Sequence, residues 1–318
     1  MTVEPLRWRT WTLQFYVPEG REAPSFEAID AFLTPFPGVH RHAPYTGMFY
    51  TYENHATGVR GSFRYDLTTQ VAATEDLAEA LEEEPPPEVP GWSVVPLEFL
   101  ASLGVATWYG WEAMPLIARA CEGLGLAVLD HHRFLGEPRV AGGEELLDRW
   151  SEANRWVLAR LADTPKERRL YLPPDRARAV WEYIVARPRL EADLASRGVR
   201  VPEVSFFAEG ADAVTMVPWE AGAASIFPRV DRVAVKRVRT GWFGLGGSPE
   251  DGWVAWEAFA QALGPRLASR PGGEAWRVYD LPRMDRALRK AVLAMPLAPL
   301  SWRDRVDPGT IVDVRIPS

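Results

Sequence analysis

The chain has 318 residues and a formal net charge of −7, with 47% hydrophobic and 25% charged residues. This balance is ordinary for globular proteins and excludes intrinsic disorder over most of the chain. No apolar run reaches the roughly 18 residues that a membrane-spanning helix needs, so we predict no membrane span. Residues 1–25 include Glu4, Glu19 and Glu22 and lack the apolar core of a signal peptide, so we expect a cytoplasmic protein.

Charge is distributed unevenly along the chain. Residues 1–150 carry 22 Asp and Glu against 10 Arg, a net charge of −12, whereas residues 151–318 carry a net charge of +5. The length also predicts two domains, since single cores rarely exceed about 250–300 residues. We place the boundary in the Gly-rich segment 136–143. The expected domains are an acidic one over residues 1–135 and a mildly basic one over residues 145–318.

The first domain alternates predicted strands and helices. Runs rich in aromatic and β-branched residues predict strands over residues 8–17, 45–53, 57–66, 92–102 and 126–129. Turn residues 54–56 join the second and third of these strands as a hairpin. One helix is expected from its N-cap Ser25 to Pro35, and another over residues 109–123, where apolar residues recur at helical spacing. This order of elements fits a ferredoxin-like α+β sandwich.

The second domain is predicted to be another α/β-sandwich unit, so the fold class of the whole chain is α+β. Strands are expected over residues 204–207, 213–217 and 229–238. Amphipathic patterns predict helices over residues 146–161, 253–263 and 284–295. A further helix follows Pro173-Pro174, and we expect Pro188 to interrupt it.

Residue patterns of the common catalytic and metal sites are missing. The chain has no GxSxG elbow and no GxxxxGK[ST] phosphate loop, and the Gly-rich loop 241–247 lacks the Lys-Ser/Thr pair. The single cysteine, Cys121, lies on an apolar helix face, where a free thiol is usually a small buried hydrophobe. The histidines lack the spacing of zinc ligands. They are His40, His42, His55, His131 and His132. We therefore predict no metal site, no cofactor and no catalytic residue.

Two kinds of feature predict contact with a protein partner. Aromatic residues occur in two predicted loops, where a large rigid surface can be desolvated at small entropic cost. An acidic run precedes three prolines, which keep it extended and exposed. The predicted partner-binding residues are Glu82, Glu83, Glu84, Trp108, Tyr109, Trp111, Trp242 and Phe243.

Part of the chain resembles known proteins. The stretches that carry the resemblance are YTYENHATGVRGSF of residues 50–63, the predicted helix 112–124 and LAVLD of residues 126–130. Over residues 45–132 the chain resembles uncharacterised bacterial proteins of the myxobacterial type, of which some are immunity-like partners of toxins. The resemblance implies only a class of function, that of an immunity-like partner of a toxin. It assigns no functional residue in this chain.

The predicted function is that of a non-enzymatic protein-binding protein, such as an immunity or adaptor protein that docks on a bacterial toxin or effector. An acidic surface would steer it onto a basic partner. Nucleic acid is not the expected partner, because carboxylates are interspersed among the clustered arginines of residues 155–178. The alternative is a hydrolase or transferase whose site lies between the domains, with His55 or His131 as the base and an arginine binding an anion.

Overall fold

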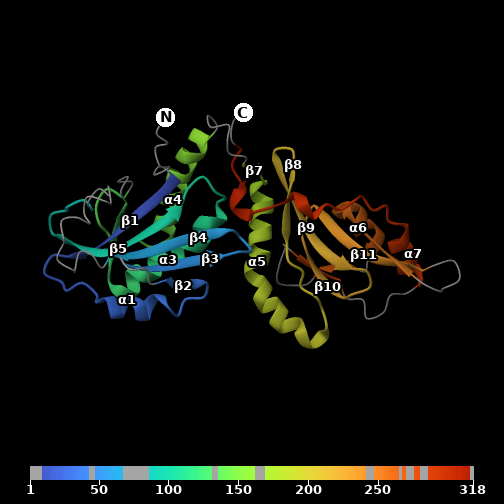
Figure 1. Ribbon diagram of the computed structural model, residues 1–318, viewed down its shortest axis with the longest axis horizontal. Helices are drawn as coiled ribbons and strands as arrows, with labels where there is room; N and C mark the ends of the chain where they lie inside the picture. The colour runs from blue at the N-terminus through green and yellow to red at the C-terminus, as the bar shows by residue number, and fades with distance from the viewer. Residues whose placement is uncertain are drawn as a thin grey trace. The chain divides into compact units, whose positions relative to one another are not determined.

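The chain divides into two compact units, unit 1 over residues 1–167 with 316–318 and unit 2 over residues 168–315. Both units combine helices with sheets, which confirms the α+β class (Figure 1). The computed structural model describes residues 9–42, 47–66, 86–130, 135–161, 169–240, 247–264, 267–269, 276–279 and 286–315.

Unit 1 is built on a six-stranded antiparallel sheet with the strand order β2-β3-β4-β5-β1-β6. Its strands are β1 (Thr10–Pro18), β2 (Val39–His42), β3 (Gly47–Asn54), β4 (Val59–Asp66), β5 (Trp92–Ser102) and β6 (Ala127–Asp130). Its helices are α1 (Phe26–Leu33), α3 (Trp108–Leu124) and α4 (Gly143–Leu161). The predicted strands and helices are confirmed at these places, and β2 is a strand that the sequence analysis did not predict.

The strand order β6-β1-β5-β4 within this sheet is that of the predicted ferredoxin-like sandwich. β5 pairs antiparallel with both β1 and β4, so β1 and β4 run parallel with one strand between them, which is a split βαβ unit. α1 and α3 cover one face of the sheet: the ring of Phe26 lies 5.3 Å from that of Tyr65, and the Tyr109 hydroxyl donates to the carbonyl oxygen of Arg60. β2 and β3 extend the sheet beyond β4.

α4 packs directly against α3. Gly110 of α3 makes this possible, because a Cβ atom at its position would lie 2.6 Å from Cε3 of Trp150. The fully buried Trp150 stacks on Tyr109, with the ring centroids 5.5 Å apart. Asn154 fastens the same helix to the loop before α3, since its Oδ1 accepts from the backbone N–H of Gly104 at 2.7 Å. These buried contacts make α4 part of unit 1.

The observed division of the chain therefore differs from the expected one. The sequence analysis ended the first domain at residue 135 and assigned α4 to a second domain over residues 145–318. The structure divides at residues 167 and 168. The Gly-rich segment is a connection within unit 1, where the backbone N–H of Val128 donates to the carbonyl oxygen of Arg139. Residues 151–167 add three acidic and three basic residues, so unit 1 keeps the net charge of −12.

Unit 2 contains a seven-stranded sheet and a three-stranded sheet. The larger sheet consists of β7 (Leu170–Tyr171), β8 (Ser205–Glu209), β9 (Asp212–Glu220), β11 (Arg232–Thr240), β12 (Gly247–Ala255), β15 (Arg305–Val306) and β16 (Ile311–Val312). The smaller sheet consists of β10 (Ser225–Pro228), β13 (Leu267–Ser269) and β14 (Trp276–Tyr279). The helices are α5 (Pro174–Leu194), α6 (Trp256–Leu263) and α7 (Arg286–Ala294), and the short 3₁₀ helix η4 covers Trp302–Asp304.

One prediction for unit 2 is wrong, and the helix predicted over residues 253–263 is confirmed with a later start, at Trp256. α5 continues through Pro188 to Leu194, and i,i+4 ion pairs such as Arg187–Glu191, at 2.9 Å, span the proline and support the last turns. Residues 253–255 end β12 and do not begin a helix, because Trp253 exchanges both backbone hydrogen bonds with Ala298 at 2.9 Å. Both outcomes depend on contacts that local sequence patterns do not show.

Candidate functional site

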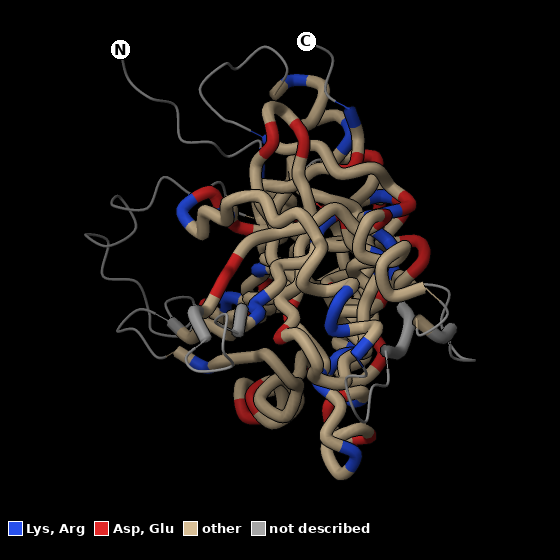
Figure 2. The backbone as a smooth tube through the Cα atoms, turned by 90° about the vertical axis from the view of Figure 1, so that its right-hand side faces the viewer, with Lys and Arg blue, Asp and Glu red and all other residues tan. Residues whose placement is uncertain are grey.

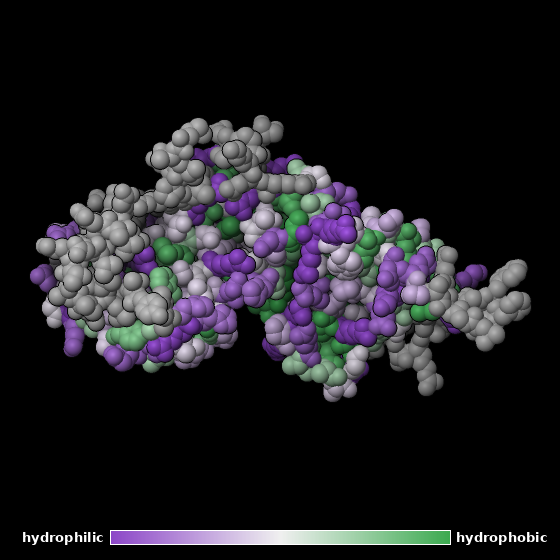
Figure 3. Space-filling model, in the orientation of Figure 1, coloured by the Kyte–Doolittle hydropathy of each residue, from purple (hydrophilic) through white to green (hydrophobic). Residues whose placement is uncertain are grey.

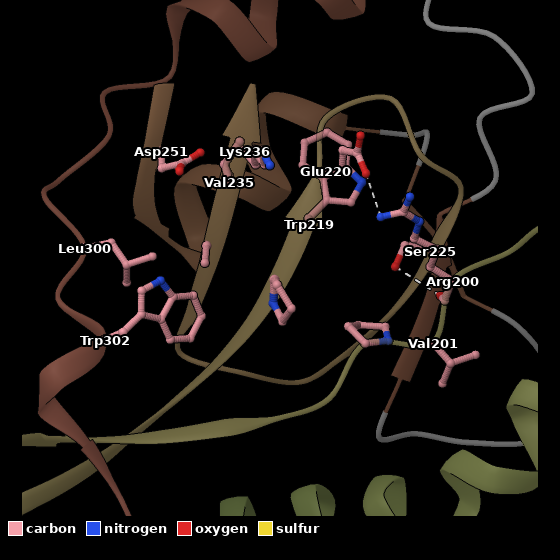
Figure 4. A pocket seen from close by; sticks show the side chains of 13 residues that line it. Arg200, Val201, Trp219, Glu220, Ser225, Val235, Lys236, Asp251, Leu300 and Trp302 are labelled. Carbon is pink, nitrogen blue, oxygen red and sulfur yellow. Dashed lines mark hydrogen bonds and ion pairs between the residues drawn. The ribbon is translucent and has the colours of Figure 1, made fainter. Parts of the chain in front are cut away.

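A groove of about 610 Å³ lies on the seven-stranded sheet of unit 2 (Figure 4). It is lined by residues from β9, β10, β11 and β12, by the segment 200–202 and by Leu300 and Trp302. All of these belong to unit 2. We call it the unit 2 groove.

Alternation along β11 decides which face of the sheet carries the groove. Successive side chains of a strand point to opposite faces. On one face Arg237 is buried and donates to the carbonyl oxygen of Met295, at the end of α7, so this face is covered by the helix. The opposite face carries Ala234, Lys236 and the 57%-exposed Val238. The groove lies on this second face.

The floor and one wall of the groove are apolar. Pro218 of β9 and Ala234 of β11 are partners in register, so they lie side by side on the floor. Leu300 packs against the buried cluster that contains Ala234. Trp302, whose ring lies 5.7 Å from that of Phe207, is 50% exposed. Figure 4 shows Leu300 and Trp302 together on one side of the groove.

The apolar wall is held in place by the edge of β12. The exchange of hydrogen bonds between Trp253 and Ala298 fastens the segment before Leu300 to this edge. Gly252 permits the close approach, because a Cβ atom at its position would lie 2.7 Å from the carbonyl oxygen of Ala298. Any larger residue would push the segment away, so the wall depends on glycine at this place.

A row of alternating charges borders the apolar floor. Lys236 is in register with Glu220 on one side and with Asp251 on the other, and Figure 4 shows it between them. Arg200 pairs with Glu220 at 2.6 Å. Neither Lys236 nor Asp251 forms an ion pair with any residue that the structure describes. The row contains two cations and two anions, so its net charge is zero.

The polar groups on the Ser225 side of the groove are already engaged. The buried Ser225 donates to the carbonyl oxygens of Arg200 and Ile226, at 3.1 and 3.3 Å. Trp219 donates from Nε1 to the carbonyl oxygen of Ala223 at 2.9 Å. Because these donors are satisfied within the chain, they hold the groove in shape and are not poised to act on a substrate.

Trp108 and Tyr109, which the sequence analysis assigned to a partner-binding surface, lie in the core of unit 1. Trp108 is 3% exposed and donates from Nε1 to the carbonyl oxygen of Thr57 at 3.0 Å. Tyr109 accepts from the backbone N–H of Ser102, and burial raises the pKa of its hydroxyl to about 12. α3 begins at Trp108, so both rings pack beneath the sheet. The structure corrects their role to a structural one.

The other predicted partner-binding residues have different positions. Trp111 is half-buried on α3 and has contacts of its own. Glu82, Glu83 and Glu84, together with Trp242 and Phe243, lie outside the described residues. Their role in partner binding stays a prediction.

The histidines of the described residues all lie in unit 1. His40 and His42 are exposed on β2, where His42 Nε2 lies 2.8 Å from the Thr51 hydroxyl. His55 is exposed in the hairpin turn, with Nδ1 3.4 Å from Oε1 of Glu53. His131 and His132 lie outside the described residues. Within the described part of the chain, no three His, Cys, Asp or Glu side chains are grouped so that they could hold a metal ion.

We expect Cys121 to be unreactive in the folded chain. The side chain is fully buried on α3, and burial raises the pKa of its thiol to about 12. The thiolate is the nucleophile, and at pH 8 only about one thiol in 10⁴ would be ionised. Iodoacetamide at pH 8 should therefore label the chain in urea and leave the native chain unlabelled over the same time. Equal labelling rates in both states would contradict the buried position.

The same raised pKa has a consequence for stability. Below the pKa of the unfolded thiol, about 8.5, the contribution of Cys121 is complete, and it decreases as the pH rises from there through about 12.

The unit 2 groove is a site that the sequence analysis missed. Pro218, Lys236 and Trp302 come from distant parts of the chain, and no motif connects them. The residue types of β11 did not reveal it either, because the charged Arg237 is buried and the apolar Val238 is exposed.

Comparison of the chain with protein-family models, with curated proteins and with solved structures found no match. Among the described residues, no helix is both long and apolar enough to cross a membrane.

Proposed function

We propose that this chain is a non-enzymatic protein-binding protein of the immunity or adaptor type, which docks on a bacterial toxin or effector. In this proposal the unit 2 groove takes up an apolar side chain of the partner. The observation that carries it is Trp302, which stays 50% exposed beside an apolar floor. Tryptophan in this position is the residue most typical of an interface hot spot.

The groove has the composition of a small contact site for protein. Its centre is apolar and its border is polar, which is the arrangement found at the core and rim of interfaces. On the face shown in Figure 3, apolar and hydrophilic residues of unit 2 are interspersed. Such a site suits one inserted side chain with a short flanking segment.

Charge favours a protein segment over a phosphate-bearing ligand. Phosphate recognition needs an excess of Arg and Lys, whereas the four charges along the groove cancel. Figure 2 shows basic and acidic residues interspersed along the backbone on the side of the molecule that it presents. The net charge of −12 on unit 1 supports a partner with a basic surface, because such a field accelerates association.

Covering Trp302 would contribute a modest part of the free energy of binding. A tryptophan side chain exposes up to about 250 Å², of which half is still exposed at Trp302. Burying that area would contribute about 3 kcal/mol. This is the size of effect that a single anchor has at a protein interface.

The test is a selection of random displayed peptides on the immobilised full chain, followed by affinity measurement of the peptides obtained. We expect peptides with an apolar anchor residue, and Trp302→Ala should weaken their binding at least about tenfold. Trp156→Ala is the matched control, because Trp156 is similarly exposed, at 46%, but lies on α4 of unit 1. Thermal unfolding of both variants separates lost binding from lost folding. Peptides that bind the Trp302→Ala chain as tightly as the native chain would refute the proposal.

A further inference from the structure

The charges along the groove are unequally satisfied. Arg200 and Glu220 already form an ion pair at 2.6 Å, so they need no partner. Lys236 and Asp251 sit in register on β11 and β12 and form no ion pair with the described residues. Neighbouring strands are about 4.8 Å apart, so the two unpaired charges lie side by side at the border of the apolar floor.

We infer that the partner segment carries an acidic and a basic residue beside its apolar anchor, the carboxylate opposite Lys236 and the cation opposite Asp251. This inference rests on the proposed function. An anchor inserted beside Trp302 would remove water from both charges, and desolvating a charge that forms no ion pair is costly. A partner that supplies both counter-charges avoids this cost, whereas a segment of a single sign meets repulsion from one of them.

The register of the sheet decides the specificity. Because Glu220, Lys236 and Asp251 alternate in sign across three strands, their fields largely cancel at a distance. Only a segment seated in the groove can distinguish them. The long-range attraction to a basic partner therefore comes from unit 1, and the choice of segment comes from Lys236 and Asp251.

The experiment repeats the peptide selection on three forms of the full chain: native, Lys236→Gln and Asp251→Asn. Peptides selected on the native chain should be enriched in both acidic and basic residues close to the anchor. Selection on Lys236→Gln should lose only the acidic enrichment, and selection on Asp251→Asn only the basic one. One native-selected peptide should bind each variant about three- to fivefold more weakly, as is usual for one exposed ion pair. In 1 M salt, where the Debye length is about 3 Å, these differences should vanish.

Matched controls are Lys290→Gln on α7 and Asp212→Asn at the start of β9, both exposed and outside the groove lining. They should select the same peptides as the native chain. One outcome is that the selected peptides keep their apolar anchor and still depend on Trp302, but show the same flanking charges for all three forms of the chain. In that case the charge inference is wrong and the proposed function stands. If no selected peptide depends on Trp302, the proposed function fails, and the charge inference fails with it.

Discussion

Replacing Arg237 with methionine is expected to lower the free energy of unfolding of unit 2 by about 3 kcal/mol, because two buried carbonyl oxygens lose their donor and each unsatisfied group costs about 1–3 kcal/mol. Arg237 is 4% exposed, its Nε donates to Glu250 at 2.9 Å, and its Nη1 donates to the carbonyl oxygens of Val292 and Met295. These carbonyls lie at the C-terminal end of α7, where a cation is favoured by the helix dipole. The substitution would leave buried acceptors without a donor.

The measurement is urea unfolding of the full chain, with hydrogen exchange of residues 286–295 to locate the loss. Lys236→Met is the matched control, since Lys236 lies on the same strand but is exposed on the opposite face. Its effect on stability should be within about 0.5 kcal/mol. An Arg237→Met chain as stable as this control would show that the guanidinium does not hold α7 on the sheet.

Replacing Trp150 with alanine is expected to destabilise unit 1 by about 3–5 kcal/mol, the usual range for a buried tryptophan. Trp150 is fully buried, stacks on Tyr109 with an interplanar angle of 11°, and donates from Nε1 to the carbonyl oxygen of Ser102 at 3.1 Å. Alanine would leave a cavity between α3 and α4 and an acceptor without its donor. The loss should appear in the unfolding of unit 1 and leave unit 2 unchanged.

This variant also tests the division of the chain. If α4 belonged to the second unit, as the charge and the Gly-rich segment suggested, Trp150→Ala would destabilise unit 2 instead. Trp156→Ala on the same helix is the control, because its exposed ring contacts the Arg160 guanidinium, 4.2 Å from the ring centroid, and fills no core volume. A loss of stability in Trp156→Ala equal to that in Trp150→Ala would contradict the packing of α4.

The two units divide the proposed function between them. Unit 1 holds the net negative charge, which acts over distances of about a Debye length, near 8 Å at physiological salt. Unit 2 holds the groove, whose contacts are short-range and whose charges cancel. We expect substitutions in the groove to change the dissociation rate chiefly, and neutralised carboxylates of unit 1 to change the association rate.

The elements with local signals follow from the amino-acid sequence alone. Ser25 caps α1 by accepting from the backbone N–H of Ala28, and Gly58, with a φ of 70°, completes the hairpin turn between β3 and β4. The order of these elements was enough to predict the ferredoxin-like sandwich, because the split βαβ connection leaves few ways to cover one face of a sheet. The amphipathic face of α4 was likewise visible before the structure was known.

Which surfaces those elements cover depends on long-range contacts. The apolar face of α4 shows that the helix packs against another element. That element is α3, because Gly110 leaves room for Trp150, about 40 residues further along the chain. For the same reason, local patterns did not show that Trp108 is buried. Its predicted position in a loop suggested an exposed side chain. The groove needed β9, β11, β12 and the segment before Trp302 to meet in one place. Local patterns indicate which residues are buried. Only contacts between distant parts of the chain decide which residues they pack against.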